Sequence, residues 1–279
     1  MNRWGFALSG RWLRYLAFAI VFAVACAGLA WWQLERRSEK VAEIQRIEQN
    51  YDAQPAQLGD ELDSLTSYRA SQEWQPVEMV GQYEVDQQLL VRNRPRNAQP
   101  GFEVLTPLRL GDGSMFIVDR GWLPVESSAL APDSIPDPPT GTVTVVARLK
   151  AGEPTVPSGT TASGVLASIH LPTIQTTLDE PTYTGAYGLV VSESPSVSVM
   201  PLPNFRPAID EGPHLSYAFQ WVVFALIGFA GLGFALRQEY RYRNADDPEE
   251  RERAEERLRK RARKRTDDDL EDALLDSRP

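Results

Sequence analysis

Residues 215–236 have the sequence LSYAFQWVVFALIGFAGLGFAL, which contains no formal charge. A second uncharged run, YLAFAIVFAVACAGLAWW, occupies residues 15–32. Each is close to the roughly 20 apolar residues with which an α-helix crosses the hydrocarbon of a bilayer. Residues 15–32 exceed the apolar stretch of about 7 to 15 residues in a cleaved signal peptide, and the residues after them form a poor cleavage site. The sequence therefore predicts an integral membrane protein with two transmembrane helices.

The distribution of charge predicts how these helices are oriented. Arg3, Arg11 and Arg14 precede the first helix without any acid, and Arg237 begins a basic stretch after the second. Lys and Arg near the ends of a span favour the cytoplasmic side. Residues 35–214 carry 13 Lys and Arg against 24 Asp and Glu. We therefore expect both termini in the cytoplasm and an acidic domain outside it.

Two membranes have this geometry. The single cysteine and the acidic outer domain fit a bacterial plasma membrane, and the first 14 residues are short for a mitochondrial transit peptide. The bacterial plasma membrane is therefore favoured over the mitochondrial inner membrane.

Five segments are expected along the chain. They are a cytoplasmic N-terminus (1–14), a first transmembrane helix (15–32), an extracytoplasmic domain with a helical stalk (33–214), a second transmembrane helix (215–236) and a charged cytoplasmic tail (237–279). Runs rich in β-branched and aromatic residues predict six strands in the outer domain, at 76–83, 88–94, 103–110, 115–123, 142–149 and 186–191. Gly-Asp-Gly at 111–113 predicts a hairpin turn, and a helix is expected near 169–178. The predicted fold class is α+β, with a mainly antiparallel sheet between two transmembrane helices.

Residue types that carry catalysis are scarce. Cys26, the only cysteine, lies within the first span and excludes an intrachain disulfide or a CxxCH haem attachment. His170 and His214 are too few for a zinc site of three histidines, and no phosphate loop or nucleophile elbow occurs. A non-enzymatic role is favoured. An extracytoplasmic hydrolase that uses acids such as Asp112 and Asp119 is the alternative class.

His214 stands at the outer end of the second span. Tyr217, Ala218 and Trp221 follow three, four and seven residues later, which places all four residues on one helix face. An imidazole beside aromatic surfaces at membrane depth is suited to the iron of an amphipathic macrocycle whose propionates reach toward water. The alternative, which the residues by themselves favour, is an aromatic belt with an interfacial histidine.

Three motifs along the chain are similar to sequence patterns of a known protein family. The exit from the first span, LAWWQLERRSEK at 29–40, is similar to the pattern LGxWQxxRxxxK, with Ala in place of Gly. A second motif combines GQY at 81–83, GFEVLTPL at 101–108 and VDRGWLP at 118–124, where Asp stands in place of a frequent Asn. HLSYAFQW at 214–221 is similar to HxxYAxxW. Together they resemble the Surfeit locus protein 1 family of cytochrome c oxidase assembly factors.

The resemblance implies a non-enzymatic role in building the haem-containing subunit of an a-type oxidase. It implies that His214, with Tyr217 and Trp221 beside it, is an axial ligand that holds haem a transiently and without covalent attachment. The implied partners are the catalytic subunit of cytochrome c oxidase, haem A synthase and membrane lipid, and no nucleic acid is expected. The alternative is a haem-free membrane scaffold that stabilises nascent oxidase subunits.

Seven further residues of these motifs are candidates for contacting the partner: Trp32, Gln33, Arg36, Lys40, Arg120, Gly121 and Trp122. For the first four, the alternative is that they anchor a helix at the membrane interface. For the last three, a buried strand with a tight bend is favoured.

The tail after residue 240 lies outside the resemblance. Asp247-Pro248 predicts a helix start, and seven of the nine residues at 257–265 are basic. Binding to anionic lipid or RNA is one interpretation. A solvated charged helix is favoured, because acids at 267–276 restore negative charge.

Overall fold

The computed structural model describes residues 4–125, 131–156, 164–260 and 262. The chain divides into two compact units. The helical unit consists of Met1–Glu39 and Glu211–Pro279, and the sheet domain consists of Lys40–Asp210.

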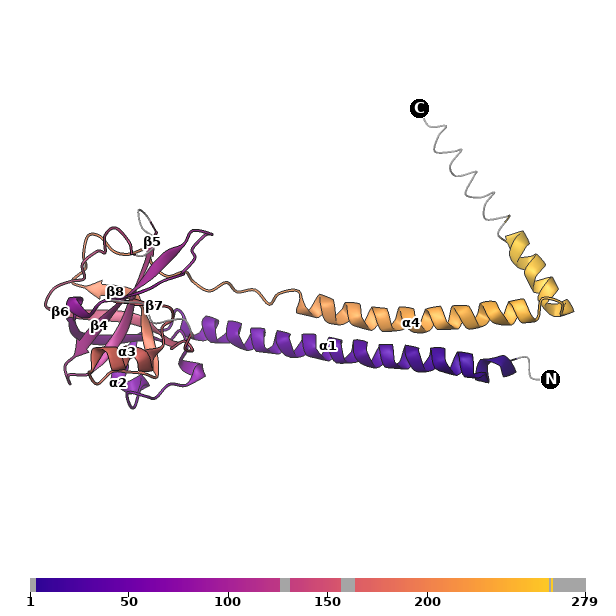
Figure 1. Cartoon of the computed structure of the whole chain (residues 1–279), viewed down its shortest axis with the longest axis horizontal. Helices are drawn as coiled ribbons and strands as arrows, with labels where there is room; N and C mark the ends of the chain where they lie inside the picture. Colours follow the sequence, from indigo (N-terminus) through magenta and orange to yellow (C-terminus); the bar gives the residue numbers. More distant parts are fainter. Residues whose placement is uncertain (1–3, 126–130, 157–163, 261, 263–279) are drawn as a thin grey trace, which may run out of the picture. The chain divides into compact units, whose positions relative to one another are not determined.

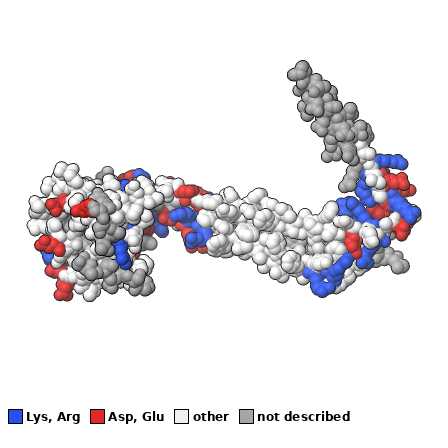
Figure 2. Space-filling model, turned by 45° about the horizontal axis from the view of Figure 1, so that its top comes forward, with Lys and Arg blue, Asp and Glu red and all other residues white. Residues whose placement is uncertain are grey.

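Long helices make up the helical unit (Figure 1). A 3-10 turn, η1 (Gly5–Leu8), precedes α1 (Gly10–Asn50), whose last turns belong to the sheet domain. α4 (His214–Arg243) follows, and a further helix begins at residue 248 and is described to residue 260. α1 and α4 are each long and apolar enough to cross a membrane. Figure 2 shows, on the face drawn, a central length of these helices without Lys, Arg, Asp or Glu.

α1 and α4 lie side by side and antiparallel within this unit. At one end, Arg11 Nη2 is 2.8 Å from Glu239 Oε1, and at the other His214 Nδ1 is 2.8 Å from Gln33 Oε1. Small side chains are buried between these ends: Ala19, Cys26, Ala30 and Ala218. Small residues allow helix backbones to approach closely where lipid gives no hydrophobic driving force.

The tail helix begins where its sequence predicts. Asp247 Oδ1 accepts a hydrogen bond from the Glu249 N–H at 3.1 Å, so its side chain caps the helix. The predicted acidic stretch at 267–276 and the end of the basic run lie outside the described residues.

The sheet domain is built on eight described strands: β1 (Ala56–Gln57), β2 (Pro76–Tyr83), β3 (Leu89–Val91), β4 (Gly101–Leu110), β5 (Met115–Pro124), β6 (Thr142–Ala151), β7 (Val165–Leu166) and β8 (Ala186–Ser194). Their order is β1-β2-β6-β8-β5-β4-β3-β7, and an additional pairing joins β2 to β4. The sheet therefore closes on itself through five strands. Gly81 lies at the closure, where a Cβ would collide with the Arg109 carbonyl, so the approach of β2 to β4 requires glycine.

The prediction of a mainly antiparallel sheet is confirmed in part, because the sheet also contains parallel pairings. Five of the eight pairings between described strands are antiparallel, but β1–β2, β3–β7 and β5–β8 are parallel. Parallel neighbours require a crossover, and β8 returns beside β5 only after β6 and the helix α3 (Leu171–Leu178). Alternation along a strand does not reveal which strand will be its neighbour.

The predicted elements are otherwise found with small shifts. The prediction for 76–83 matches β2, and the Gly-Asp-Gly turn joins β4 to β5. β3 is shorter than the predicted 88–94, and Asn93 just beyond it has a φ of 60°, a left-handed conformation that interrupts extended backbone. β1 and β7 were not predicted, because two residues carry no periodic pattern.

Two apolar clusters lie on the two faces of the sheet. Phe116 and Val118 of β5 belong to one cluster, and Ile117 belongs to the other. Ile47 from the end of α1 and Ile174 from α3 cover the second cluster. Because β5 is covered on both faces, its sequence is an almost continuous apolar run, and any polar residue within it is buried.

Candidate functional site

His214 is the first residue of α4, and its ring is held by a residue of α1. Its Nδ1 lies 2.8 Å from Gln33 Oε1, and the ring is half-buried. With the proton on Nδ1, this contact is an N–H···O hydrogen bond, and Nε2 carries the lone pair. Metal-ligating histidines generally donate their other ring N–H to such an acceptor, which orients the ring.

The segment before His214 keeps one edge of the imidazole uncovered. Gly212 has a φ of +69°, and a Cβ there would lie 3.4 Å from His214 Nε2. A side chain at this position would therefore contact the ring edge that carries Nε2. Arg37 Nη2 is 2.7 Å from Glu211 Oε2, so an ion pair also fastens this segment to α1.

The aromatic candidates near these helix ends are unequally exposed. Trp32 and Tyr217 are about half exposed, at 55% and 47%. Trp221 packs edge-to-face against Phe224 at 5.8 Å. The helix face predicted for α4 thus presents one exposed ring beside His214 and one partly covered ring a turn further on.

The remaining candidates on α1 bind acids of their own helix. Arg36 pairs with Glu39 at 2.8 Å and Lys40 with Glu43 at 2.7 Å. Of the predicted residues, the structure therefore joins His214 directly to Gln33 only. A single imidazole, an exposed aromatic surface and nearby cations suit one bond to the iron of a planar, anionic macrocycle.

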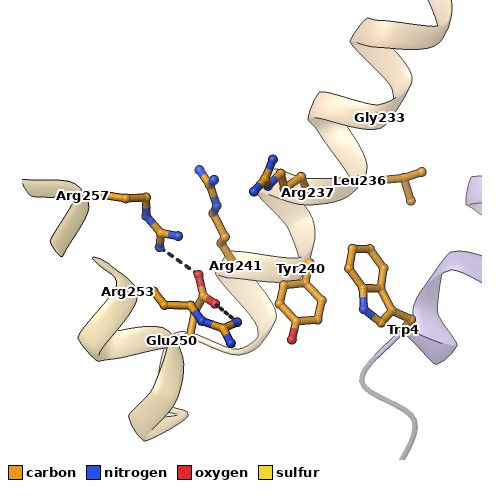
Figure 3. Close-up of a pocket in the computed structure, with 9 residues that line it drawn as sticks. All are labelled: Trp4, Gly233, Leu236, Arg237, Tyr240, Arg241, Glu250, Arg253 and Arg257. Carbon is orange, nitrogen blue, oxygen red and sulfur yellow. Dashed lines mark hydrogen bonds and ion pairs between the residues drawn. The ribbon is translucent and has the colours of Figure 1, made fainter. Parts of the chain in front are cut away.

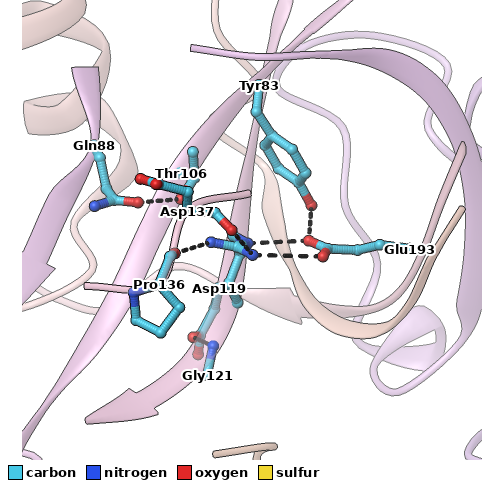
Figure 4. A network of polar contacts seen from close by, with 9 residues as sticks. Tyr83, Gln88, Thr106, Asp119, Gly121, Pro136, Asp137 and Glu193 are labelled. Atoms are coloured by element: carbon cyan, nitrogen blue, oxygen red, sulfur yellow. Dashed lines mark hydrogen bonds and ion pairs between the residues drawn. The ribbon is translucent and has the colours of Figure 1, made fainter. Parts of the chain in front are cut away.

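Arg120 lies in the interior of the sheet domain, at 0% exposure. Figure 4 shows Tyr83 and Glu193 of the polar network around it. The side chains of Arg120 and Glu193 are fully buried, and Arg120 Nε is 3.0 Å from Glu193 Oε1. Tyr83 donates its hydroxyl proton to the same oxygen at 2.7 Å. Arg120 Nη1 donates to the Pro136 carbonyl at 2.8 Å. Burial and the neighbouring carboxylate raise the pKa of Tyr83 far above its ordinary value, so Tyr83 remains a donor.

A β-bulge explains why Arg120 points inward. Gly121 pairs with Val104, whereas Asp119 pairs with Leu105, so Arg120 is the extra residue. Gly121 has a φ of +131°, and a Cβ there would lie 2.5 Å from the Leu202 carbonyl oxygen. Bulges re-aim side chains in this way. Arg120, Gly121 and Trp122 therefore lie in a buried strand with a tight bend, which is the interpretation that the sequence favoured for them.

Trp122 forms part of a pocket of about 210 Å³ beside the bulge. Its Nε1–H donates to the Arg94 carbonyl at 2.6 Å. Arg96 and Phe205 also line the pocket, and the guanidinium of Arg96 lies 3.8 Å from the centre of the Phe205 ring. Trp122 is 5% exposed, so its indole is a wall of this pocket rather than a free surface.

Asp119 is a buried titratable group behind this pocket. Its two oxygens accept hydrogen bonds of 2.9 Å, from the Gly121 N–H and from Asn204 Nδ2. Burial, together with the charge of Glu103, raises its pKa to about 8. From the sequence, Asp119 was a candidate only as an acid of the alternative hydrolase, although an Asp inside an apolar strand signals burial.

Asp119 makes the stability of the fold depend on pH. Its pKa is about 8 in the folded chain against an ordinary 3.8, so between these values the folded chain holds a proton that the unfolded chain has lost. This stabilisation is complete below about pH 4 and is lost as the pH rises through 8, at up to about 1.4 kcal/mol per pH unit. We expect Asp119→Asn to flatten the fall in the free energy of unfolding between pH 5 and 8, measured by urea unfolding of the full chain.

Asp112→Asn is the matched control. Hydrogen bonds from Ser114 lower the pKa of Asp112, so this carboxyl does not titrate between pH 5 and 8 and the slope should persist. If Asp119→Asn also leaves the slope unchanged, then Asp119 is ionised in the fold.

Glu193, Tyr83 and Asn204 were not among the sequence candidates. Glu193 is a lone acid in the otherwise apolar and small sequence of β8, which is a signal for a buried partner. Nothing in the sequence identifies Arg120 as that partner, because 73 residues separate them. Among the described residues, no group of three His, Cys, Asp or Glu is arranged to hold a metal ion.

Comparison with known proteins gives consistent matches. The model of the SURF1 family matches residues 20–226. An uncharacterised SURF1-like protein of Mycobacterium tuberculosis is 31% identical over 252 residues, which cover 88% of this chain and 91% of that protein. A SURF1-like protein of Rickettsia bellii is 23% identical over 205 residues, covering 69% and 78%. One of Dictyostelium discoideum is 29% identical over 111 residues, covering 37% and 40%.

Proposed function

The chain belongs to the SURF1 family, and on this premise we propose that it is an assembly factor for a cytochrome c oxidase that contains haem a. In this proposal it is not an enzyme. It holds or stabilises haem a for insertion into the catalytic subunit, and haem a is its cargo.

The proposed setting is a bacterial plasma membrane, crossed by α1 and α4. Their length and composition support this. The basic residues Arg11 and Arg14 at one end of α1, and Arg237 and Arg241 near the end of α4, support cytoplasmic termini by the positive-inside rule. The sheet domain then lies outside the cytoplasm.

The observation that carries the proposal is the contact between His214 and Gln33. Gln33 accepts from Nδ1, so Nε2 would be the nitrogen that holds the iron of haem a, and the contact with Gln33 would orient the ring. Tyr217 and Trp221 offer aromatic surface, and Gly212 leaves the ring edge uncovered. A noncovalent axial bond suits a carrier that must release its cargo.

The proposed partners are the catalytic subunit, haem A synthase and membrane lipid. Trp32, Arg36 and Lys40 are proposed to contact a partner from α1, and Trp31, at 71% exposure, adds an aromatic surface there. That surface also favours the second candidate function, a haem-free scaffold for nascent subunits. A scaffold would bind the subunit equally well after His214 is replaced, as pull-down would show.

The test is a reduced-minus-oxidised absorption spectrum of membranes from cells lacking this chain, with the oxidase subunits quantified in the same samples. We expect the a-type haem signal to fall while the subunits persist. A normal a-type signal would contradict the proposed function.

A further inference from the structure

Arginines surround a pocket at the end of α4 (Figure 3). The pocket has a volume of about 580 Å³ and lies in the helical unit between the last turns of α4 and the tail helix. Arg237 and Arg241 contribute from α4, and Arg253 and Arg257 contribute from the tail helix. Glu250 is the one acid among the lining residues. The lining therefore has an excess of three positive charges.

Glu250 forms ion pairs with the two arginines of the tail helix, Arg253 and Arg257. It is 7% exposed, and its carboxylate lies 2.8 Å from Arg257 Nη2 and 3.8 Å from Arg253 Nη1. Among the described residues, no acid pairs with Arg237 or Arg241. These two arginines are one helical turn apart, so their guanidinium groups can converge on one anion. Guanidinium forks bind phosphate oxygens through paired hydrogen bonds.

The other end of the pocket is apolar. Leu236 is the last residue of the uncharged run, and Arg237 follows it directly. Gly233, one turn earlier, has open space where a Cβ would stand. Trp4 stacks on Tyr240 with ring centres 4.4 Å apart and planes 19° from parallel, which gives the pocket a rigid aromatic wall. Such rings are typical of the level of lipid head groups.

We propose that this pocket binds one anionic phospholipid, with its phosphate between Arg237 and Arg241 and an acyl chain along Gly233 and Leu236. The inference rests on the proposed crossing of the membrane by α4. The shared chemistry of the ligand is a phosphate group, which a free phosphate ion also has. The adjoining apolar groove favours a lipid, because a free ion would leave that surface empty.

The site also explains the arrangement of the tail. The described part of the tail helix brings Arg253 and Arg257 to the same pocket, and a bound phosphate would lower the repulsion among the four arginines. Basic pockets beside cytoplasmic helix ends bind acidic lipid head groups in this manner. The lipid would therefore fasten the tail to the end of α4.

The test uses the purified full chain in detergent, with phosphatidylglycerol titrated and binding measured by native mass spectrometry. We expect Arg237→Gln combined with Arg241→Gln to weaken binding about tenfold or more, as loss of two charge-assisted contacts implies. The matched control combines Arg251→Gln with Arg259→Gln. Arg251 and Arg259 are 64% and 83% exposed and do not line the pocket. An equal loss of phosphatidylglycerol binding in the control would mean that the total positive charge, and not this pocket, determines binding, and it would overturn the proposal.

A second variant distinguishes lipid from free phosphate. A Cβ at position 233 would have open space around it, so we expect the side chain of Gly233→Leu to occupy the groove and to weaken phosphatidylglycerol binding while binding of inorganic phosphate is unchanged. If Gly233→Leu has no effect on either ligand, and inorganic phosphate competes fully with the lipid, the site binds free phosphate and the lipid assignment is wrong. These assays contain no haem and no oxidase, so their failure is separate from failure of the proposed function.

Discussion

His214→Ala should reduce the haem a that copurifies with the full-length chain by more than about tenfold. The variant removes the proposed axial nitrogen and leaves α4 intact, since alanine is a good helix former. Replacing a residue that only orients a metal ligand costs about 10- to 100-fold in metal affinity. Replacing the ligand itself should cost at least as much. The measurement is haem content per chain, by absorption of the purified protein.

One matched variant and one rescue experiment separate ligation from folding. His170→Ala removes the other histidine, which bonds to Thr173 in the sheet domain, and should leave haem content unchanged. Free imidazole added to His214→Ala should restore part of the haem, because it can occupy the space left by the ring. Unchanged haem content in His214→Ala would exclude His214 as the ligand.

Gln33→Leu tests the orienting contact by itself. We expect a smaller loss than for His214→Ala, about tenfold, because Nε2 remains but the ring is no longer held. Equal haem content in Gln33→Leu and the unaltered chain would mean that the contact at 2.8 Å does not orient the ligand.

Arg120→Met should lower the free energy of unfolding of the sheet domain by about 3 to 5 kcal/mol, the usual cost of leaving one partner of a buried ion pair uncompensated. Glu193 is fully buried, and among the described residues its carboxylate would keep only the hydroxyl of Tyr83 as a partner. The carbonyls of Pro136 and Asp137 would lose their donors as well. Denaturant unfolding of the full chain, followed by tryptophan fluorescence, measures the change.

A double variant and an exposed control locate the cause. Arg120→Met combined with Glu193→Leu should recover much of the loss, because the uncompensated charge is removed. Arg69→Met breaks an exposed contact with Asp63 at 3.7 Å and should cost less than about 1 kcal/mol. A loss for Arg120→Met as small as that for Arg69→Met would show that Glu193 is not held as a buried anion.

The two candidate regions have different physical characters. The residues around His214 are half exposed, and a carrier needs that access to load and release its cargo. The network of Arg120, Glu193 and Tyr83 is buried and its members are paired, and Arg120 is the extra residue of the bulge between β4 and β5. That bulge in turn positions Trp122 at the small pocket.

Local patterns were enough to predict the two long apolar helices and most of the long strands from the sequence. The uncharged runs at 15–32 and 215–236 predicted α1 and α4, and alternation predicted most of the long strands, because hydropathy and periodicity depend on neighbours along the chain. His214 was also found this way, since its aromatic neighbours are spaced on one helix face. Gln33 was named from a motif, without any indication of what it contacts.

Only the tertiary structure decided which distant residues meet. His214 and Gln33 are 181 residues apart, and β5 and β8 became parallel neighbours through a crossover that alternation does not encode. Asp119 has a raised pKa because the fold removes it from water and places Glu103 nearby, which its sequence neighbours do not specify. The sequence by itself therefore determined the long helices and most of the long strands. The packing between them determined the chemistry, because burial and electrostatic interactions are set by distance in space.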